Sequence, residues 1–152
     1  MLDDVDRTLL IALQANARAT NAELAELACL SESACSRRVR ALEQRGVIAG
    51  YAARIDPQAV GRGLTVFVSI SLSSQSQPVL EAFETAVRGA PEIVECHLMT
   101  GEADYLVRVA VADVADLERF HTHVLTKLPG VARISSSISL RAAVSRPGAP
   151  IR

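Results

Sequence analysis

The chain has 152 residues, of which 49% are hydrophobic, and its formal net charge is −1. That length allows one medium domain or two small ones, and the apolar content is sufficient for a buried core. The near-neutral charge excludes a basic polyelectrolyte, so any basic surface for nucleic acid must be local. No apolar run approaches the roughly 20 residues that span a bilayer, and the acidic start, MLDDVDR, is unlike a signal peptide. We therefore expect a cytoplasmic protein.

The three cysteines, Cys29, Cys35 and Cys96, are odd in number and lack the spacing of a zinc site. This pattern favours neither a disulfide framework nor a structural metal. We expect buried, reduced thiols, and we expect no metal and no cofactor.

The N-terminal part of the chain predicts three short helices. Apolar residues recur at helical spacing from Val5 to Leu13, after an acidic start that suits the positive end of a helix dipole. The segment Thr20-Asn21-Ala22-Glu23 fits a capping box and predicts a second helix that stops near Leu30. Ser31 is a suitable N-cap for a third helix, and Gly46 can supply the left-handed residue after its end.

The third predicted helix has one apolar and one polar face. On a helical wheel Cys35, Val39 and Leu42 cluster, and polar side chains fall opposite them. A short helix, a turn and a helix with an outward Arg, Ser and Gln face is typical of helix-turn-helix proteins, in which Arg binds guanine and Gln binds adenine. Arg38 on the flank can reach phosphates. The candidate DNA-binding residues are Ser33, Ser36, Arg37, Arg38, Arg40 and Gln44.

The alternative for this helix is an ordinary amphipathic helix with a solvated basic face. Two features favour DNA binding. Residues 32–45 carry four arginines and two glutamates, a local charge of +2 in a chain of net charge −1. Residues 47–51 and 53–55 then form a pattern typical of a small strand pair, which would be the wing of a winged helix-turn-helix.

Turn residues divide the chain. Asp56-Pro57 and Gly61-Arg62-Gly63 lie between two differently patterned regions. We expect a winged helix-turn-helix domain with its linker at residues 1–60, a second domain at 61–144, and a mobile tail at 145–152.

The second domain alternates strands and helices. Residues 64–72, 93–100, 105–111 and 131–142 predict strands, and the runs after Pro78 and after Val114 predict helices. The order strand-helix-strand-strand-helix-strand is the ferredoxin-like split motif, so the fold class is α+β. Its two helices cover one face of the sheet. Because the other face is bare, we expect it to pair with another chain in a homodimer.

An ordered set of short motifs runs through the chain up to about Ala143. In the first domain these are Ser31, Cys35, Arg38-Val39, Leu42-Glu43, Gly46, Ile48, Gly50-Tyr51 and Asp56-Pro57. In the second they are Glu95-Cys96-His97, Thr100-Gly101, Asp104-Tyr105-Leu106 and Leu128-Pro129-Gly130-Val131. In this ordered set the chain resembles the Lrp/AsnC family of transcriptional regulators, the family of the leucine-responsive regulatory protein and the asparagine-synthetase regulator.

The resemblance implies a winged helix-turn-helix joined to an ACT-like ferredoxin domain that senses amino acids, with dimers that assemble into tetramers or octamers. In such proteins the effector lies between dimers, near the hairpin turn of one subunit and the last strand of another. Carried onto this sequence, the effector-binding residues are Met99, Thr100, Gly101, Glu102, Ala103, Asp104, Tyr105, Ser136, Ser137 and Ile138.

The residues of that turn allow two interpretations. Gly101 permits close approach of a ligand to the backbone, and Asp104 can pair with an ammonium group. Alternatively, Gly101 and Asp104 only close the hairpin, since both are common turn residues. The pattern alone favours the second interpretation, and the resemblance favours the first.

Two other functions compete with an amino-acid-responsive, sequence-specific DNA-binding regulator. Siroheme-decarboxylating enzymes share the architecture, and His97, His121 and His123 are the residues that such an activity would use. His121 and His123 are two residues apart on a predicted helix and point in different directions, so we expect no enzyme. A low-specificity architectural DNA-binding protein would carry more lysine than the single Lys127.

Overall fold

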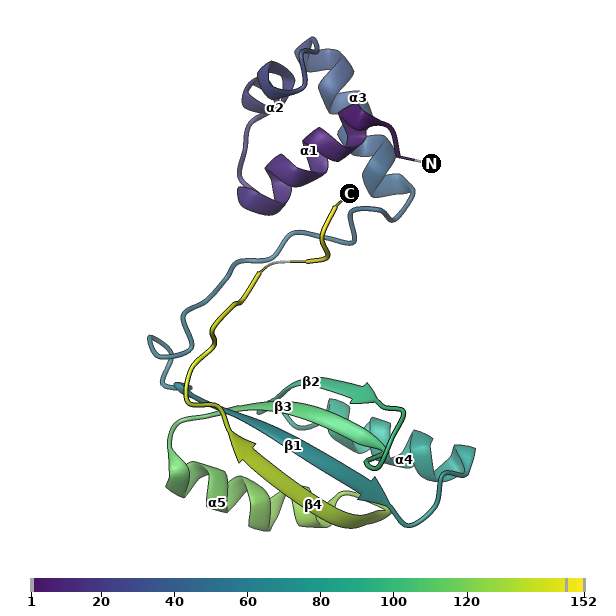
Figure 1. Ribbon diagram of the computed structural model, residues 1–152, viewed down its shortest axis with the longest axis vertical. Helices are drawn as coiled ribbons and strands as arrows, with labels where there is room; N and C mark the ends of the chain where they lie inside the picture. Colours follow the sequence, from purple (N-terminus) through teal and green to yellow (C-terminus); the bar gives the residue numbers. More distant parts are fainter. Residues whose placement is uncertain (1, 147, 152) are drawn as a thin grey trace. The chain divides into compact units, whose positions relative to one another are not determined.

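The computed structural model describes residues 2–146 and 148–151. Contacts divide the chain into two compact units. One holds the residues up to Arg54 together with those from Ala143 onward, and the other is Ile55–Ala142. The first unit is helical, and the second contains the sheet (Figure 1).

Three helices make up the N-terminal unit: α1 at Asp4–Ala15, α2 at Asn21–Leu27 and α3 at Glu32–Gln44. The expected caps are present. The Thr20 side chain accepts from the Glu23 amide and the Glu23 carboxylate accepts from the Thr20 amide, a complete capping box. The Ser31 hydroxyl accepts from the amide of Ala34, so α3 begins where the sequence predicts.

Leu9, Leu24, Ala25 and Cys35 form the core of this unit. Cys35 is fully buried, and burial raises the pKa of its thiol. The expectation of three buried thiols is wrong for Cys29, which is exposed, while Cys96 is half-buried. Cys29 lies in the turn after α2 with φ at 53°, a left-handed conformation in which the chain reverses direction.

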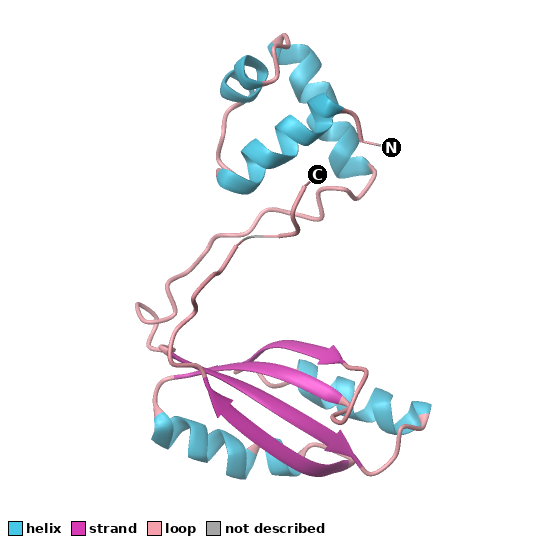
Figure 2. Cartoon of the chain, in the orientation of Figure 1, coloured by secondary structure: helices cyan, strands magenta, loops and turns pink. Residues whose placement is uncertain are grey.

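The expected pair of wing strands is not formed. Residues 49–56 have no regular secondary structure, and Figure 2 draws the whole connection from α3 to the sheet as loop. The two stretches that the pattern favoured are separated by Ala52 alone. A tight hairpin needs at least two loop residues, so these stretches cannot pair with each other.

The second unit has the expected element order: β1 Leu64–Leu72, α4 Gln77–Arg88, β2 Ile93–Leu98, β3 Tyr105–Val111, α5 Val114–His123 and β4 Val131–Ile138, with a short 3-10 helix at Leu125–Lys127. The strands form one antiparallel sheet in the order β2-β3-β1-β4. This is the ferredoxin-like topology, and the predicted α+β fold is confirmed. The last strand stops at Ile138, four residues earlier than the pattern indicated.

The two faces of the sheet differ. On one face, alternate residues of β1 and β3 are buried with Phe83 of α4 and Phe120 of α5, so both helices lie against this face (Figure 1). The opposite face, called here the open face, has no covering element within the described unit. Its centre is Phe67 of β1, which is 40% exposed. By strand register the open face holds Thr65, Phe67, Ser69, Glu95, His97, Leu106, Arg108, Ala110, Ser135 and Ser137.

None of the helices in the described part of the chain is long and apolar enough to cross a membrane.

Candidate functional site

The polar face of α3 is exposed where the wheel places it. Cys35 and Leu42 are buried, whereas the four residues opposite them are exposed. These are Ser33, Arg37, Arg40 and Gln44. In the described part of the chain, the ion pairs include neither Arg37 nor Arg40. Both guanidinium groups are therefore available to a base edge or a phosphate.

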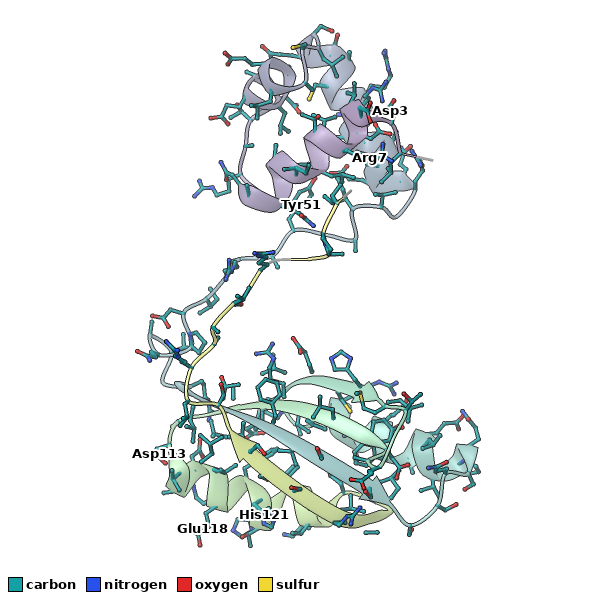
Figure 3. The ribbon with its side chains drawn as sticks, in the orientation of Figure 1. Asp3, Arg7, Tyr51, Asp113, Glu118 and His121 are labelled. Atoms are coloured by element: carbon teal, nitrogen blue, oxygen red, sulfur yellow. The ribbon has the colours of Figure 1, made fainter. Side chains whose placement is uncertain are left out.

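Arg38 is used differently. Its Nη1 lies 2.6 Å from Oδ2 of Asp3 and 2.9 Å from Oδ1 of Asp6, at the start of α1 (Figure 3 labels Asp3). The Asp6 side chain is almost fully buried. The backbone N–H of Asp6 and the Arg38 guanidinium hold the pKa of Asp3 below its usual value, and the two carboxylates raise the pKa of Arg38. Arg38 thus connects α3 to α1, and Ser36 beside it is half-buried.

We expect Arg38→Ala to lower the thermal midpoint of the protein, because it leaves the buried Asp6 carboxylate without its ion-pair partner. Arg38 lowers the pKa of Asp3 in addition to the larger lowering by the Asp6 amide. The Arg38–Asp3 ion pair therefore stabilises the fold above the ordinary aspartate pKa, and this stabilisation is lost as pH falls through the folded value. Thermal melts of wild type and variant from neutral to acid pH test this, and the gap between them should close in acid. A gap that stays constant with pH would contradict this role.

The hairpin turn between β2 and β3 is closed by one backbone hydrogen bond, from the Met99 amide to the Asp104 carbonyl at 2.8 Å. Met99, Thr100, Gly101 and Glu102 are exposed, and Ala103 is half-buried. Gly101 has φ at +127°, a conformation that strongly favours glycine. The sequence-predicted turn residues therefore form one exposed loop.

Asp104 and Tyr105 differ from the rest of the turn because both are buried. The Asp104 carboxylate accepts from the Leu72 amide and from the Gln75 side chain, each at 2.6 Å. The Tyr105 hydroxyl donates to Oε1 of Glu84 at 2.9 Å. Burial and this contact raise the pKa of Tyr105 well above its usual value. Gln75 and Glu84 were not predicted from the sequence, since no local pattern places either beside the turn.

The strand residues of the expected effector site are split between the two faces of the sheet. Ser137 pairs with Phe67 and lies on the open face, whereas Ser136 and Ile138 pair with Val68 and Val66 and lie on the helix side. β4 and β3 are separated by β1, which places them about 10 Å apart at the usual strand spacing. One chain therefore does not bring the turn and residues 136–138 together.

The three histidines form no joint site. His97 lies on the open face, 3.6 Å from Oε2 of Glu95, whose other oxygen accepts from Arg108 at 2.6 Å. Arg108, followed by His97, lowers the pKa of Glu95. His121 and His123 are exposed on α5, where Figure 3 labels His121. Within the described residues, no group of three His, Cys, Asp or Glu side chains is placed to hold a metal ion.

Two family models match the chain and together cover most of it. The Lrp/AsnC ligand binding domain matches residues 65–149, and the AsnC-type helix-turn-helix domain matches residues 2–43. The chain belongs to the Lrp/AsnC family of transcriptional regulators. The β2–β3 turn lies in the first matched region, and α3 up to Glu43 lies in the second.

Individual proteins similar to this chain are also transcriptional regulators. An HTH-type transcriptional regulator of Sinorhizobium fredii is 50% identical over 112 residues, which are 74% of this chain and 88% of the relative. The Bkd operon transcriptional regulator of Pseudomonas aeruginosa is 40% identical over 150 residues, 99% of this chain and 98% of the relative. A Neisseria meningitidis transcriptional regulator, solved with L-Met, has a TM-score of 0.94 at 35% identity and covers 99% of this chain and 97% of its own.

Membership in the Lrp/AsnC family decides against the enzyme that the sequence left in competition with a regulator. The family consists of transcriptional regulators and not of enzymes, and the second domain is a ligand-binding domain. The histidines therefore need no catalytic role.

Proposed function

We propose that this regulator binds a specific DNA sequence through α3 and that a free amino acid changes its operator affinity or its oligomeric state. The observation that carries the DNA-binding part is the exposed face of α3, where Arg37 and Arg40 lie opposite the buried Cys35 and Leu42. Ser33, Ser36 and Gln44 supply further polar groups, and Arg38 sets the position of the helix through Asp3 and Asp6. Its place of action is the cytoplasm, where the DNA is.

The proposed effector site includes the β2–β3 turn. Gly101 leaves open space beside the backbone, since an added Cβ would meet no atom within 4 Å. Of the two carboxylates in the turn, Asp104 is engaged with the chain's own amides, and Glu102 is exposed. Glu102 is therefore the better partner for a ligand ammonium. The L-Met complex of the Neisseria relative supports an amino acid as the ligand class.

The proposed assembly is a dimer through the open face. Phe67 lies at its centre, flanked in register by Arg108 on β3 and Ser137 on β4. Covering this face with a second copy would remove the exposed part of the Phe67 ring from water, and a two-fold arrangement would present two copies of α3 to successive major grooves. The turn and residues 136–138 of the same chain lie apart, because β1 stands between β3 and β4. A complete effector site therefore requires residues from neighbouring chains in a larger assembly of these dimers.

A thermal-shift screen of the twenty free amino acids tests the effector proposal. A ligand present at about 100 times its Kd should stabilise the folded protein by roughly 2.7 kcal/mol, a shift of several degrees. Glu102→Ala should lose most of the shift. Glu118→Ala, which removes an exposed carboxylate from α5 (labelled in Figure 3), should keep it. Absence of any shift in wild type at millimolar amino acid would refute an amino-acid effector.

A further inference from the structure

Asp104 joins three segments of the effector domain. Its amide donates to the Ile70 carbonyl at 3.0 Å, and its carbonyl accepts from the Met99 amide at 2.8 Å. Its two carboxylate oxygens accept from Leu72 and from Gln75. The residue is only 9% exposed. One residue, through its backbone and its carboxylate, therefore fixes the start of β3, the end of β1 and the loop that follows β1.

Gln75 extends this connection to α4. It lies in the loop between β1 and α4, and the next residue, Ser76, is the N-cap of α4. Its Nε2 donates to Oδ1 of Asp104 at 2.6 Å. Tyr105 is held from the other side by Glu84, which lies within α4. The last residue of the turn and the first residue of β3 are thus both attached to the α4 segment.

We propose that Gln75 is a positioning residue for the effector turn and that it acts through Asp104. With both oxygens of Asp104 engaged by amides, this carboxylate orders the backbone of the turn and leaves the ligand to the exposed residues 99–102. When the turn is ordered before the ligand arrives, ligand binding loses less conformational entropy. Displacement of the turn also displaces the start of α4. The assignment of the turn to an effector rests on the proposed function, whereas the Gln75–Asp104 contact does not.

An amide swap tests the contact in the full-length, ligand-free protein. Gln75→Glu keeps the shape of the side chain but removes the donor and puts a second carboxylate beside Asp104. The Leu72, Met99 and Asp104 amides should then exchange with solvent roughly 10- to 100-fold faster. The double variant Q75E/D104N exchanges the donor and the acceptor of the hydrogen bond between these two side chains. The side-chain amide that D104N introduces can donate to the new carboxylate while its oxygen still accepts from Leu72, so slow exchange should return.

Gln77→Glu is the matched control. Gln77 carries the same side chain two residues later, and its Nε2 donates to Glu81 on the surface of α4 at 2.9 Å. The same substitution there brings two carboxylates together away from the turn, so exchange at Leu72, Met99 and Asp104 should match wild type. The Ala110 amide, which donates to Glu92 at the far end of β3, should be unaffected in every variant.

The outcomes separate this inference from the effector proposal. Unchanged exchange in Gln75→Glu, or exchange that stays fast in the double variant, would overturn the positioning role. If Gln75→Glu fails to fold, a folded double variant with slow exchange would support it and an unfolded one would overturn it. Calorimetry with L-methionine adds a functional readout, in which Gln75→Glu should bind at least tenfold more weakly and the double variant should recover. If wild type binds neither L-methionine nor any other amino acid in the thermal-shift screen, the effector proposal fails, and the Gln75–Asp104 contact is still decided by exchange.

Discussion

Arg37→Ala and Arg40→Ala are each expected to weaken binding to the specific DNA site by about 5- to 150-fold, without a change in thermal midpoint. This range corresponds to the roughly 1–3 kcal/mol of discrimination of one bidentate base contact. Both side chains are exposed, so their removal leaves the core of the N-terminal unit intact. A site selected in vitro from random DNA by the wild-type protein serves as the probe, with affinities measured at one stated salt concentration.

Lys127→Ala is the control for loss of one positive charge, since Lys127 is exposed in the 3-10 helix of the other unit. It should bind the selected site like wild type. Random DNA distinguishes base contacts from phosphate contacts. Removing an arginine that contacts a base should weaken binding mainly to the selected site. Removing an arginine that contacts a phosphate should weaken binding to both DNAs and lower the slope of log affinity against log salt concentration by about one. Wild-type affinity in both arginine variants would show that α3 is not the helix that recognises the DNA sequence.

Phe67→Asp should abolish dimers. The substitution places a carboxylate at the centre of the open face, and burying an unpaired charge in an interface costs several kcal/mol. The side chain is already partly exposed in the single chain, so the fold of the unit should survive. Light scattering at micromolar concentration should give a dimer or larger assembly for wild type and a monomer for the variant. Binding to a palindromic site should weaken with it.

Val114→Asp provides the comparison, because Val114 is an exposed apolar residue at the start of α5 and is not on the open face. It introduces the same charge and should leave the assembly unchanged. Wild-type mass for Phe67→Asp, or a monomer for both variants, would show that the open face is not the interface.

Much of the fold could be predicted because the decisive signals are local. A capping box needs only Thr20 and Glu23, an N-cap needs only Ser31, and both begin helices where expected. Alternation from Leu64 to Leu72 predicts a strand because one face of the sheet is buried and the other is open. The exposed face of α3 follows from helical periodicity and one buried stripe.

The structure differs from the sequence-based predictions where contacts between residues far apart in the chain determine the arrangement. Arg38 lies on the flank of α3, and only the fold shows that Asp3 and Asp6, more than 30 residues earlier, engage it. The local pattern allows Asp104 an ammonium partner, and only the fold shows that its carboxylate accepts from Leu72 and Gln75. The pattern of residues 47–55 favours a strand pair, but the single residue between its two stretches is too short for the turn.

Coupling between the amino-acid site and the DNA-binding face is tested most directly by one titration. Affinity of the full chain for the selected DNA site is measured without and with a saturating amount of the amino acid that gives the largest thermal shift. Coupled sites predict a change of about 5- to 150-fold, and linkage requires that saturating DNA change the amino-acid affinity by the same factor. Equal DNA affinity in the presence and absence of a bound amino acid would contradict the coupling.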